Sequence, residues 1–163
     1  MLIHPKGAKI LIVGEAWGKE EAKEGKPFVG LAGRVLDGIL EEVGLVRQRI
    51  GITNIIHERP PNNDFSTYYE KVKGKIQPSQ KLRDAYQRLY QEIKEVKPNV
   101  IVALGREPLK ALTDKDKISF WRGSVLDTDH GKVIPTYHPA AVLRNWNYRP
   151  AVVCDLPIVT GKQ

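Results

Sequence analysis

Short apolar runs alternate with amphipathic stretches along the chain. Runs rich in β-branched residues predict four buried strands, at Lys9–Val13, Ile50–Ile56, Asn99–Leu104 and Lys132–Thr136. Apolar residues at three- and four-residue spacing, or a proline at a first turn, predict helices over Ala32–Val43, Leu82–Val96, Glu107–Leu112 and Pro139–Asn145. This alternation favours a three-layer α/β/α sandwich around a central, mostly parallel four-stranded sheet.

The segments between these elements have no clear period. Gly14–Gly30 is rich in glycine and charge and is expected to form a long functional loop. Arg59–Asp64 must end the second strand, because it contains two prolines followed by asparagine and aspartate. Pro135 indicates a strand end or a sheet edge.

Polar segments follow three of the predicted strands, at Gly14–Gly18, Thr53–Asn54 and Thr136–Pro139. In open α/β sheets, ligands bind beyond the carboxyl ends of the strands. We therefore expect these three segments to converge on one edge of the sheet and to form the functional site there.

Composition narrows the class of protein. A length of 163 residues fits one domain over residues 1–163, and 41% apolar with 28% charged residues is an ordinary soluble balance. No apolar run is long enough to cross a bilayer and no signal peptide is visible, so a cytoplasmic, nucleoid-associated location is expected without a membrane partner. The net charge of +7 favours an acidic partner, nucleic acid first.

Cys154 is the single cysteine, which excludes an internal disulfide and a centre built on several thiolates. Its apolar neighbours predict a buried side chain. No Walker A loop, dinucleotide fingerprint, serine-hydrolase elbow or paired histidine motif is present. Nucleotide hydrolysis, dinucleotide redox chemistry and serine hydrolysis are therefore disfavoured.

Five segments resemble the uracil-DNA glycosylase superfamily, most closely its family 4. In chain order they are Gly14–Gly18, Pro27–Gly33, Thr53–Asn54 with Arg59–Pro61, Val102–Gly105 and His138–Arg144. The resemblance extends from Lys9 to about Asn145. It implies a monomeric enzyme that flips uracil out of single- or double-stranded DNA, hydrolyses the N-glycosidic bond and leaves an abasic site.

The chain departs from the family 4 pattern in three places. That family implies an iron–sulfur cluster on four cysteines, but its third ligand position is Glu58 here and its fourth falls near Ala85. The first cysteine pair is missing because the chain starts at the first strand, so no cofactor or metal is predicted. Trp17 replaces the usual proline, and Ala22 replaces a frequent aspartate. These two changes put the substrate range in question.

The resemblance implies specific roles for three residues at the base. Asn54 would read uracil, because one carboxamide orientation pairs with its N3–H and O4 but mispairs with cytosine. Phe28 would stack on the flipped base. His138 would donate to O2, where negative charge develops. The structural alternatives are a turn-capping Asn54, a core Phe28 and a His138 that bonds a backbone carbonyl.

Two carboxylates complete the implied catalytic set. Glu15 would position the attacking water or stabilise the sugar cation, and the backbone of Ala16 would contact the base. Glu21 would lie near the C5 edge of the base and exclude a thymine methyl group. The alternative for both glutamates is a solvated loop charge.

Further candidates are assigned to DNA binding, namely Gly30, Gly33, Arg59, Gly105, Val142, Leu143 and Arg144. The last three would form a wedge that fills the hole left by the flipped base, or else the apolar face of a helix start. The glycines and Arg59 would approach phosphates or permit close backbone packing. Lys71, Lys73, Lys75, Lys81 and Arg83 form a basic run that either holds phosphates or is simply solvated.

Two other functions remain open. Trp17 and Ala22 leave room for a glycosylase of the same fold that acts on another base, such as hypoxanthine or xanthine. The missing cluster leaves room for an inactive relative that binds DNA or a protein partner.

Overall fold

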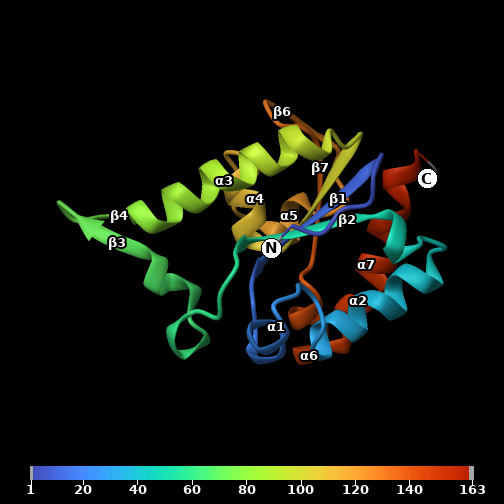
Figure 1. Cartoon of the computed structure of the whole chain (residues 1–163), viewed down its shortest axis with the longest axis horizontal. Coiled ribbons are helices and arrows are strands. Elements are labelled where there is room, and N and C mark those ends of the chain that lie inside the picture. Colours follow the sequence, from blue (N-terminus) through green and yellow to red (C-terminus); the bar gives the residue numbers. More distant parts are fainter. Residues whose placement is uncertain (1, 162–163) are drawn as a thin grey trace.

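The computed structural model describes residues 2–161 and shows a five-stranded sheet between two layers of helices (Figure 1). The strands are β1 (Ile10–Ala16), β2 (Gly51–Ile56), β5 (Val100–Leu104), β6 (Leu126–Thr128) and β7 (Gly131–Thr136), in the order β2-β1-β5-β7-β6. The first four are parallel, and β6 pairs antiparallel with β7. The carboxyl ends of β1, β2, β5 and β7 therefore meet at one edge.

Two apolar cores lie on opposite faces of the sheet. Helices α2 (Leu31–Glu42), α6 (Pro139–Arg144) and α7 (Arg149–Asp155) cover one face, where their apolar side chains pack on Ile12 and Val102. Helices α3 (Gln80–Val96) and α4 (Arg106–Leu112) cover the other face over Leu11 and Ile101. The side chains of neighbouring residues in each strand thus pack into opposite cores, as the two-residue period of a strand requires.

The sequence pattern explains where the long helix α3 begins and ends. The Ser79 hydroxyl accepts a hydrogen bond from the Leu82 backbone N–H at 3.3 Å, which caps the first turn. The helix ends at Lys97, which adopts a left-handed conformation with φ 54° just before Pro98. The apolar side chains between these ends recur every three or four residues and are buried.

Smaller elements complete the chain. They are the helices α1 (Lys19–Glu24) and α5 (Ile118–Trp121), the hairpin strands β3 (Tyr69–Val72) and β4 (Lys75–Pro78), and the 3-10 turns η1 (Arg47–Arg49), η2 (Pro61–Asn63), η3 (Phe65–Tyr68), η4 (Trp146–Tyr148) and η5 (Leu156–Thr160). The β3–β4 hairpin pairs with no other strand and projects away from the sheet (Figure 1).

The predicted three-layer α/β fold is confirmed, with corrections. The sheet has five strands and not four, because the three-residue edge strand β6 is too short to carry a pattern. The predicted loop Gly14–Gly30 contains α1. Cys154 was expected to be buried but is exposed, because it lies on the outward side of α7. Pro135 is tolerated because β6 pairs with β7 only up to Val133.

Strand order also locates the place where a ligand can enter. The chain leaves β1 toward β2 on one side and later returns to β5 on the other side, so the connections diverge between β1 and β5. Such a switch point opens a crevice at the carboxyl ends of the strands. Within residues 2–161, none of the helices has the length and apolar character that a bilayer crossing requires.

Candidate active site

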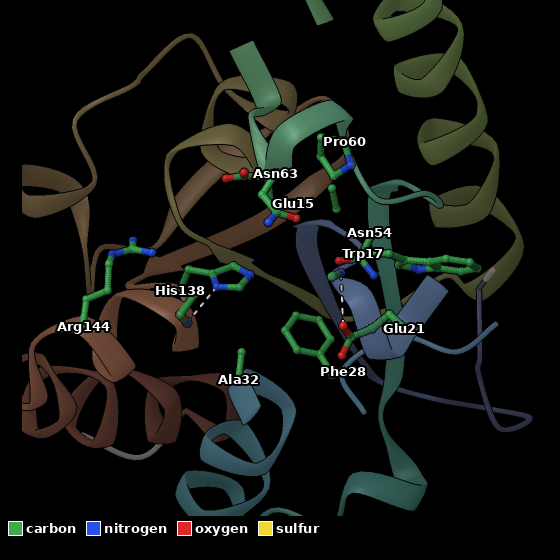
Figure 2. A pocket seen from close by; sticks show the side chains of 13 residues that line it. Glu15, Trp17, Glu21, Phe28, Ala32, Asn54, Pro60, Asn63, His138 and Arg144 are labelled. Atoms are coloured by element: carbon green, nitrogen blue, oxygen red, sulfur yellow. Dashed lines mark hydrogen bonds between the residues drawn. The ribbon is translucent and has the colours of Figure 1, made fainter. Parts of the chain in front are cut away.

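A cavity of about 280 Å³ lies at this carboxyl edge (Figure 2). It is lined by Glu15, Ala16, Trp17, Gly18, Glu21, Phe28, Ala32, Asn54, Pro60, Asn63, His138, Ala140 and Arg144. The structure therefore brings together all six predicted catalytic and base-contacting residues, and it adds Arg144 from the predicted DNA-binding set. The lining residues come from β1, β2 and the segments that follow β1, β2 and β7.

Gly14 allows the base-reading and stacking side chains to share one small space. A Cβ atom at this position would overlap the Asn54 Oδ1 atom and the Phe28 ring. Asn54 is 2% exposed and Phe28 is 5% exposed, so neither side chain can move aside cheaply. A glycine at the first residue of the Gly14–Gly18 motif is therefore a packing requirement of the site.

Phe28 is held in an unusual backbone conformation. Its φ of 51° lies in the left-handed region, which costs a non-glycine residue about 1 kcal/mol or more. Gly33 packs directly against the Phe28 carbonyl, where any Cβ would clash. The Phe28 ring lies 5.7 Å from the His138 ring, with an angle of 30° between their planes. The loop is thus shaped to present the phenyl ring to the cavity.

A charged network behind β2 supports Asn54. The Arg88 guanidinium on α3 donates to the Asn54 carbonyl at 2.8 Å and also to the Ile55 carbonyl. Arg88 is paired with Glu92 at 2.6 Å, and Glu92 in turn accepts from the Thr53 hydroxyl at 2.7 Å. Asn54 and the residues on both sides of it are therefore tied to α3, which holds the strand end that carries the Asn54 side chain in place.

His138 presents one defined ring nitrogen to the cavity. The Ala140 backbone N–H donates to His138 Nδ1 at 3.0 Å, so a neutral ring carries its hydrogen on Nε2. Burial, followed by the positive charge of Arg144, lowers the pKa of His138 to about 4. The imidazole is therefore neutral near pH 7, and its Nε2–H is a hydrogen-bond donor. The predicted alternative, in which the ring donates to a backbone carbonyl, has no counterpart among the described contacts of His138.

Glu15 is a carboxylate whose proton affinity is strongly shifted. Burial is the main cause and the nearby Glu107 carboxylate the second, and together they raise the pKa of Glu15 to about 7. The Arg144 guanidinium acts in the opposite direction. A carboxyl group that titrates near neutral pH is suited to accept a proton from water.

Glu21 performs a structural task at the rim of the cavity. Its Oε2 atom accepts from the backbone N–H groups of Val29 at 2.8 Å and Gly30 at 2.7 Å, and its Oε1 accepts from Gly18 at 3.1 Å. The carboxylate thus ties the first loop to the start of α2. It lines the cavity, but its oxygens already have three backbone donors.

The predicted DNA-binding residues divide into two groups. Val142 is fully buried in a core, so it is unavailable as a wedge, whereas Leu143 is 44% exposed and Arg144 is exposed. Arg59 is also exposed, and its Nε donates to Asn63 Oδ1 at 2.6 Å.

The three glycines favour the packing alternative. The N–H of Gly30 is used by Glu21, and Gly33 is buried under the Phe28 carbonyl. Gly105 has φ 96° and packs against His138, where a Cβ would lie 3.2 Å from that of the histidine. These glycines shape the site and do not offer free N–H groups to phosphates.

Six lining residues were not among the predicted site residues, namely Trp17, Gly18, Ala32, Pro60, Asn63 and Ala140. Pro60 and Asn63 enter the cavity from η2 and the residue before it, although this segment was interpreted as a strand breaker and, at Pro60, as part of a motif, without a site role. The paired asparagines at Asn62 and Asn63 are a signal for left-handed backbone, and both adopt it, with φ 54° and 57°. Trp17 lines the cavity, and its backbone N–H donates to the Glu58 carbonyl at 3.1 Å.

The residues at the expected cluster position do not fit an iron–sulfur cluster. The one cysteine, Cys154, is exposed on α7, and residues 2–161 contain no group of three or more potential metal ligands. Instead, Glu58 accepts hydrogen bonds from the Tyr68 hydroxyl at 2.8 Å and the Lys81 ammonium at 2.9 Å. A polar cluster thus occupies the place where family 4 would have a thiolate.

The fold and the cavity define an α/β protein with a small, partly aromatic pocket at the carboxyl edge of its sheet. The sequence profile of the uracil DNA glycosylase superfamily matches residues 2–156. The chain belongs to this superfamily.

Among its relatives, the Type-4 uracil-DNA glycosylase of Thermotoga maritima is 41% identical over 141 residues, which are 84% of this chain and 67% of that protein. The Type-4 uracil-DNA glycosylase of Archaeoglobus fulgidus is 37% identical over 152 residues, which are 88% of this chain and 69% of that protein. A DNA polymerase of Bacillus phage SP01 is 28% identical over 157 residues, which are 96% of this chain but 16% of that protein.

Proposed function

We propose that this chain is a uracil-DNA glycosylase that hydrolyses the bond between uracil and deoxyribose. The observation that carries the proposal is the neutral His138, whose Nε2–H is directed by the Ala140 contact into the cavity that also holds Asn54 and Phe28. The similarity to Type-4 uracil-DNA glycosylases supports the same activity.

Recognition of the base would use the buried side chains of the cavity. The flipped uracil stacks on the Phe28 ring, and the Asn54 carboxamide pairs with N3–H and O4. Cytosine presents the reversed donor and acceptor pattern and leaves both groups unpaired, which costs about 1–3 kcal/mol for each buried group. Discrimination thus comes from the fixed orientation of Asn54.

Bond cleavage would place charge where the site can stabilise it. As the bond from C1′ to N1 breaks, the electron pair moves into the base, and the His138 Nε2–H donates to the negative O2. Water then attacks C1′ and loses a proton to the Glu15 carboxylate. No lysine among residues 2–161 lines the cavity, so these residues offer no amine for a covalent sugar intermediate, and the product is an abasic site.

The test is excision from an oligonucleotide that contains one uracil, followed by alkali. Strand cleavage that requires alkali is the expected result, and His138→Ser should lower it by about 100-fold or more. The serine keeps an acceptor for the Ala140 N–H and so leaves the helix cap in place. Binding of DNA without any base release would overturn the proposal and favour a binding protein.

Trp17 motivates a second candidate, a glycosylase of the same fold that prefers another base. Trp17 lines the cavity in place of the family's proline, and its ring lies 5.7 Å from the His57 ring, so the first loop differs from the common pattern. Duplexes that carry hypoxanthine or xanthine separate the two candidates, because this alternative requires faster release of one of those bases than of uracil.

The state in which the protein acts belongs to the same proposal. We propose that residues 1–163 form one domain, that it acts on single- or double-stranded DNA as a monomer, and that it resides with the nucleoid. The net charge of +7 suits an anionic partner. Light scattering of the free protein and of its DNA complex tests the monomer.

A further inference from the structure

The β3–β4 hairpin is a protruding arm. Its strands pair only with each other, from Tyr69 opposite Pro78 to Val72 opposite Lys75. Lys73 and Gly74 form the turn, with φ of 51° and 80°, as a tight two-residue hairpin turn requires. The arm lies at one end of the long axis of the molecule (Figure 1). Four residues of strand place its tip about 13 Å beyond its base.

The base of the arm is fastened to the domain. The Tyr69 hydroxyl donates to Glu107 at 2.5 Å, and the Lys110 ammonium lies 4.3 Å from the centre of the Tyr69 ring. The Tyr68 hydroxyl donates to Glu58 at 2.8 Å, and the Ser79 N–H donates to the Tyr68 carbonyl at 2.8 Å. An isolated two-stranded hairpin is marginally stable in water, so these contacts are what present the arm in a fixed direction.

The outer part of the arm carries unbalanced charge and exposed apolar surface. Lys71, Lys73 and Lys75 are exposed, and within residues 2–161 no carboxylate forms an ion pair with any of them. Ile76 is 77% exposed, more than any other large apolar side chain of the described residues. Val72 is 39% exposed on the other face of the hairpin, opposite Lys75. Within the described part of the chain, both side chains remain open to solvent.

The arm is connected directly to the cavity. It follows η2 and η3 in the chain, and Pro60 and Asn63 at the start of this connection line the cavity. A DNA strand whose base occupies the cavity must continue past its rim on both sides. We infer that the arm binds the phosphate backbone of that DNA away from the flipped nucleotide, with its lysines on phosphates and Ile76 against the sugars. This inference rests on the proposed function.

The charge of the arm favours DNA as its binding partner. Lysines placed along a hairpin can contact the regularly spaced phosphates of DNA whatever the base sequence. Such contacts position a protein on the duplex without reading its sequence. Lysines on a free strand edge have another use, because they prevent pairing with other chains. The two uses differ in one measurable property, since only phosphate contacts release counterions from DNA.

The experiment compares two triple variants of equal charge. One is Lys71→Gln with Lys73→Gln and Lys75→Gln on the arm. The other is Lys6→Gln with Lys9→Gln and Lys94→Gln, three exposed lysines away from the arm and cavity. Fluorescence anisotropy measures the affinity for a duplex of about three helical turns over a series of salt concentrations. The arm variant should lower the slope of log affinity against log salt by about 2 to 3, at about 0.9 per phosphate contact.

Excision assays add a second comparison. With the long duplex, the arm variant should lose about tenfold or more in kcat/KM at low salt. A uracil trinucleotide is too short to reach the tip and should be excised at the wild-type rate. Equal slopes for the arm variant and the wild type would overturn the inference, as would equal losses in both triple variants. If the wild type releases no uracil from either substrate, the proposed function fails, while the anisotropy slopes still decide whether the arm binds DNA.

Discussion

The cavity and the β3–β4 arm are held in place by different means. Side chains of the cavity are fixed by close packing and by backbone hydrogen bonds, such as Gly14 under Asn54 and Phe28, and Ala140 on His138. The arm is fixed at its base by tyrosine–carboxylate pairs, Tyr68 with Glu58 and Tyr69 with Glu107. The first arrangement tolerates almost no change in atom positions, whereas the second depends on a few polar contacts at a partly solvated surface.

The two regions should therefore affect different properties: the cavity the rate of base release, and the arm the binding of long DNA. Changes in the cavity should affect the rate of base release on every substrate. Changes at the base of the arm should affect stability and long DNA, and leave the chemical step alone. The following predictions test this separation, from the largest expected effect to the smallest.

Replacement of the cavity histidine should have the largest effect. His138→Ser removes the Nε2–H donor but keeps a capping acceptor for α6, so excision should fall by about 100- to 1000-fold with little change in Tm. His130→Ser is the matched control, because His130 stacks on Tyr90 outside the cavity. Single-turnover excision rates measure the effect. A loss smaller than tenfold would remove His138 from the catalytic set.

The pH dependence of excision should follow Glu15. With its pKa raised to about 7, the rate should rise about tenfold per pH unit below neutral and level off above it. Glu15→Gln should lower the plateau and flatten the rise, whereas Glu24→Gln, on an exposed residue, should do neither.

Stability should show the opposite trend at the same residue. Below pH 4.5 the Glu15 carboxyl is protonated in both the folded and the unfolded chain. Between about 4.5 and 7 the unfolded chain loses this proton first, so the folded state becomes less stable as pH rises. Denaturant unfolding of wild type and Glu15→Gln measures this. An excision rate of the wild-type protein that stays constant across pH 5–7 would contradict the shifted pKa of Glu15.

Gly14→Ala should damage both chemistry and packing. The added methyl group overlaps Asn54 and Phe28, so excision should fall by about tenfold to a hundredfold, and unfolding should require about 1–3 kcal/mol less. Gly38→Ala is the control, because nothing lies near its added Cβ on α2, and it should stabilise the protein by about 0.5–1 kcal/mol. Equal Tm values for wild type and Gly14→Ala would mean that the loop moves aside freely.

The smallest effect is expected at the base of the arm. Tyr68→Phe should cost about 1 kcal/mol of stability and leave trinucleotide excision unchanged. The Lys81 ammonium and the Tyr68 hydroxyl both lower the pKa of Glu58, so this contact contributes above the ordinary glutamate pKa and is lost as pH falls below it. A double-mutant cycle with Glu58→Gln should show a positive coupling energy at pH 7. Coupling that does not weaken at all as pH falls below the ordinary glutamate pKa would contradict the ionised contact.

The same contrast explains what could be predicted from the sequence. Asn54 lies on a predicted apolar strand, and Glu15 and His138 closely follow the predicted strands that became β1 and β7. Their convergence on one edge therefore followed from pattern and topology. The arm carries no such pattern. Its four-residue strands are exposed on both faces, so alternation of apolar and polar residues has no reason to appear.

Individual side chains were predictable only where the motif also determined their surroundings. Val142 and Leu143 are neighbours in one motif, yet one is in the core and the other is exposed, because α6 turns by about 100° per residue. Glu21 was expected at the base, but distant backbone N–H groups at Val29 and Gly30 occupy its carboxylate. Such partners depend on how loops fold against each other, which a local pattern does not contain.

The isolation of the arm has a consequence for how its length can change. Because β3 and β4 pair only with each other, residues inserted in matched pairs next to the Lys73–Gly74 turn disturb no contact of the sheet or the cavity. Insertion of two residues in each strand keeps every side chain on its own face, whereas one residue in each moves the outer side chains to the opposite face. The hairpin is therefore an adjustable spacer, and relatives of this chain are free to differ in it while they keep the same cavity.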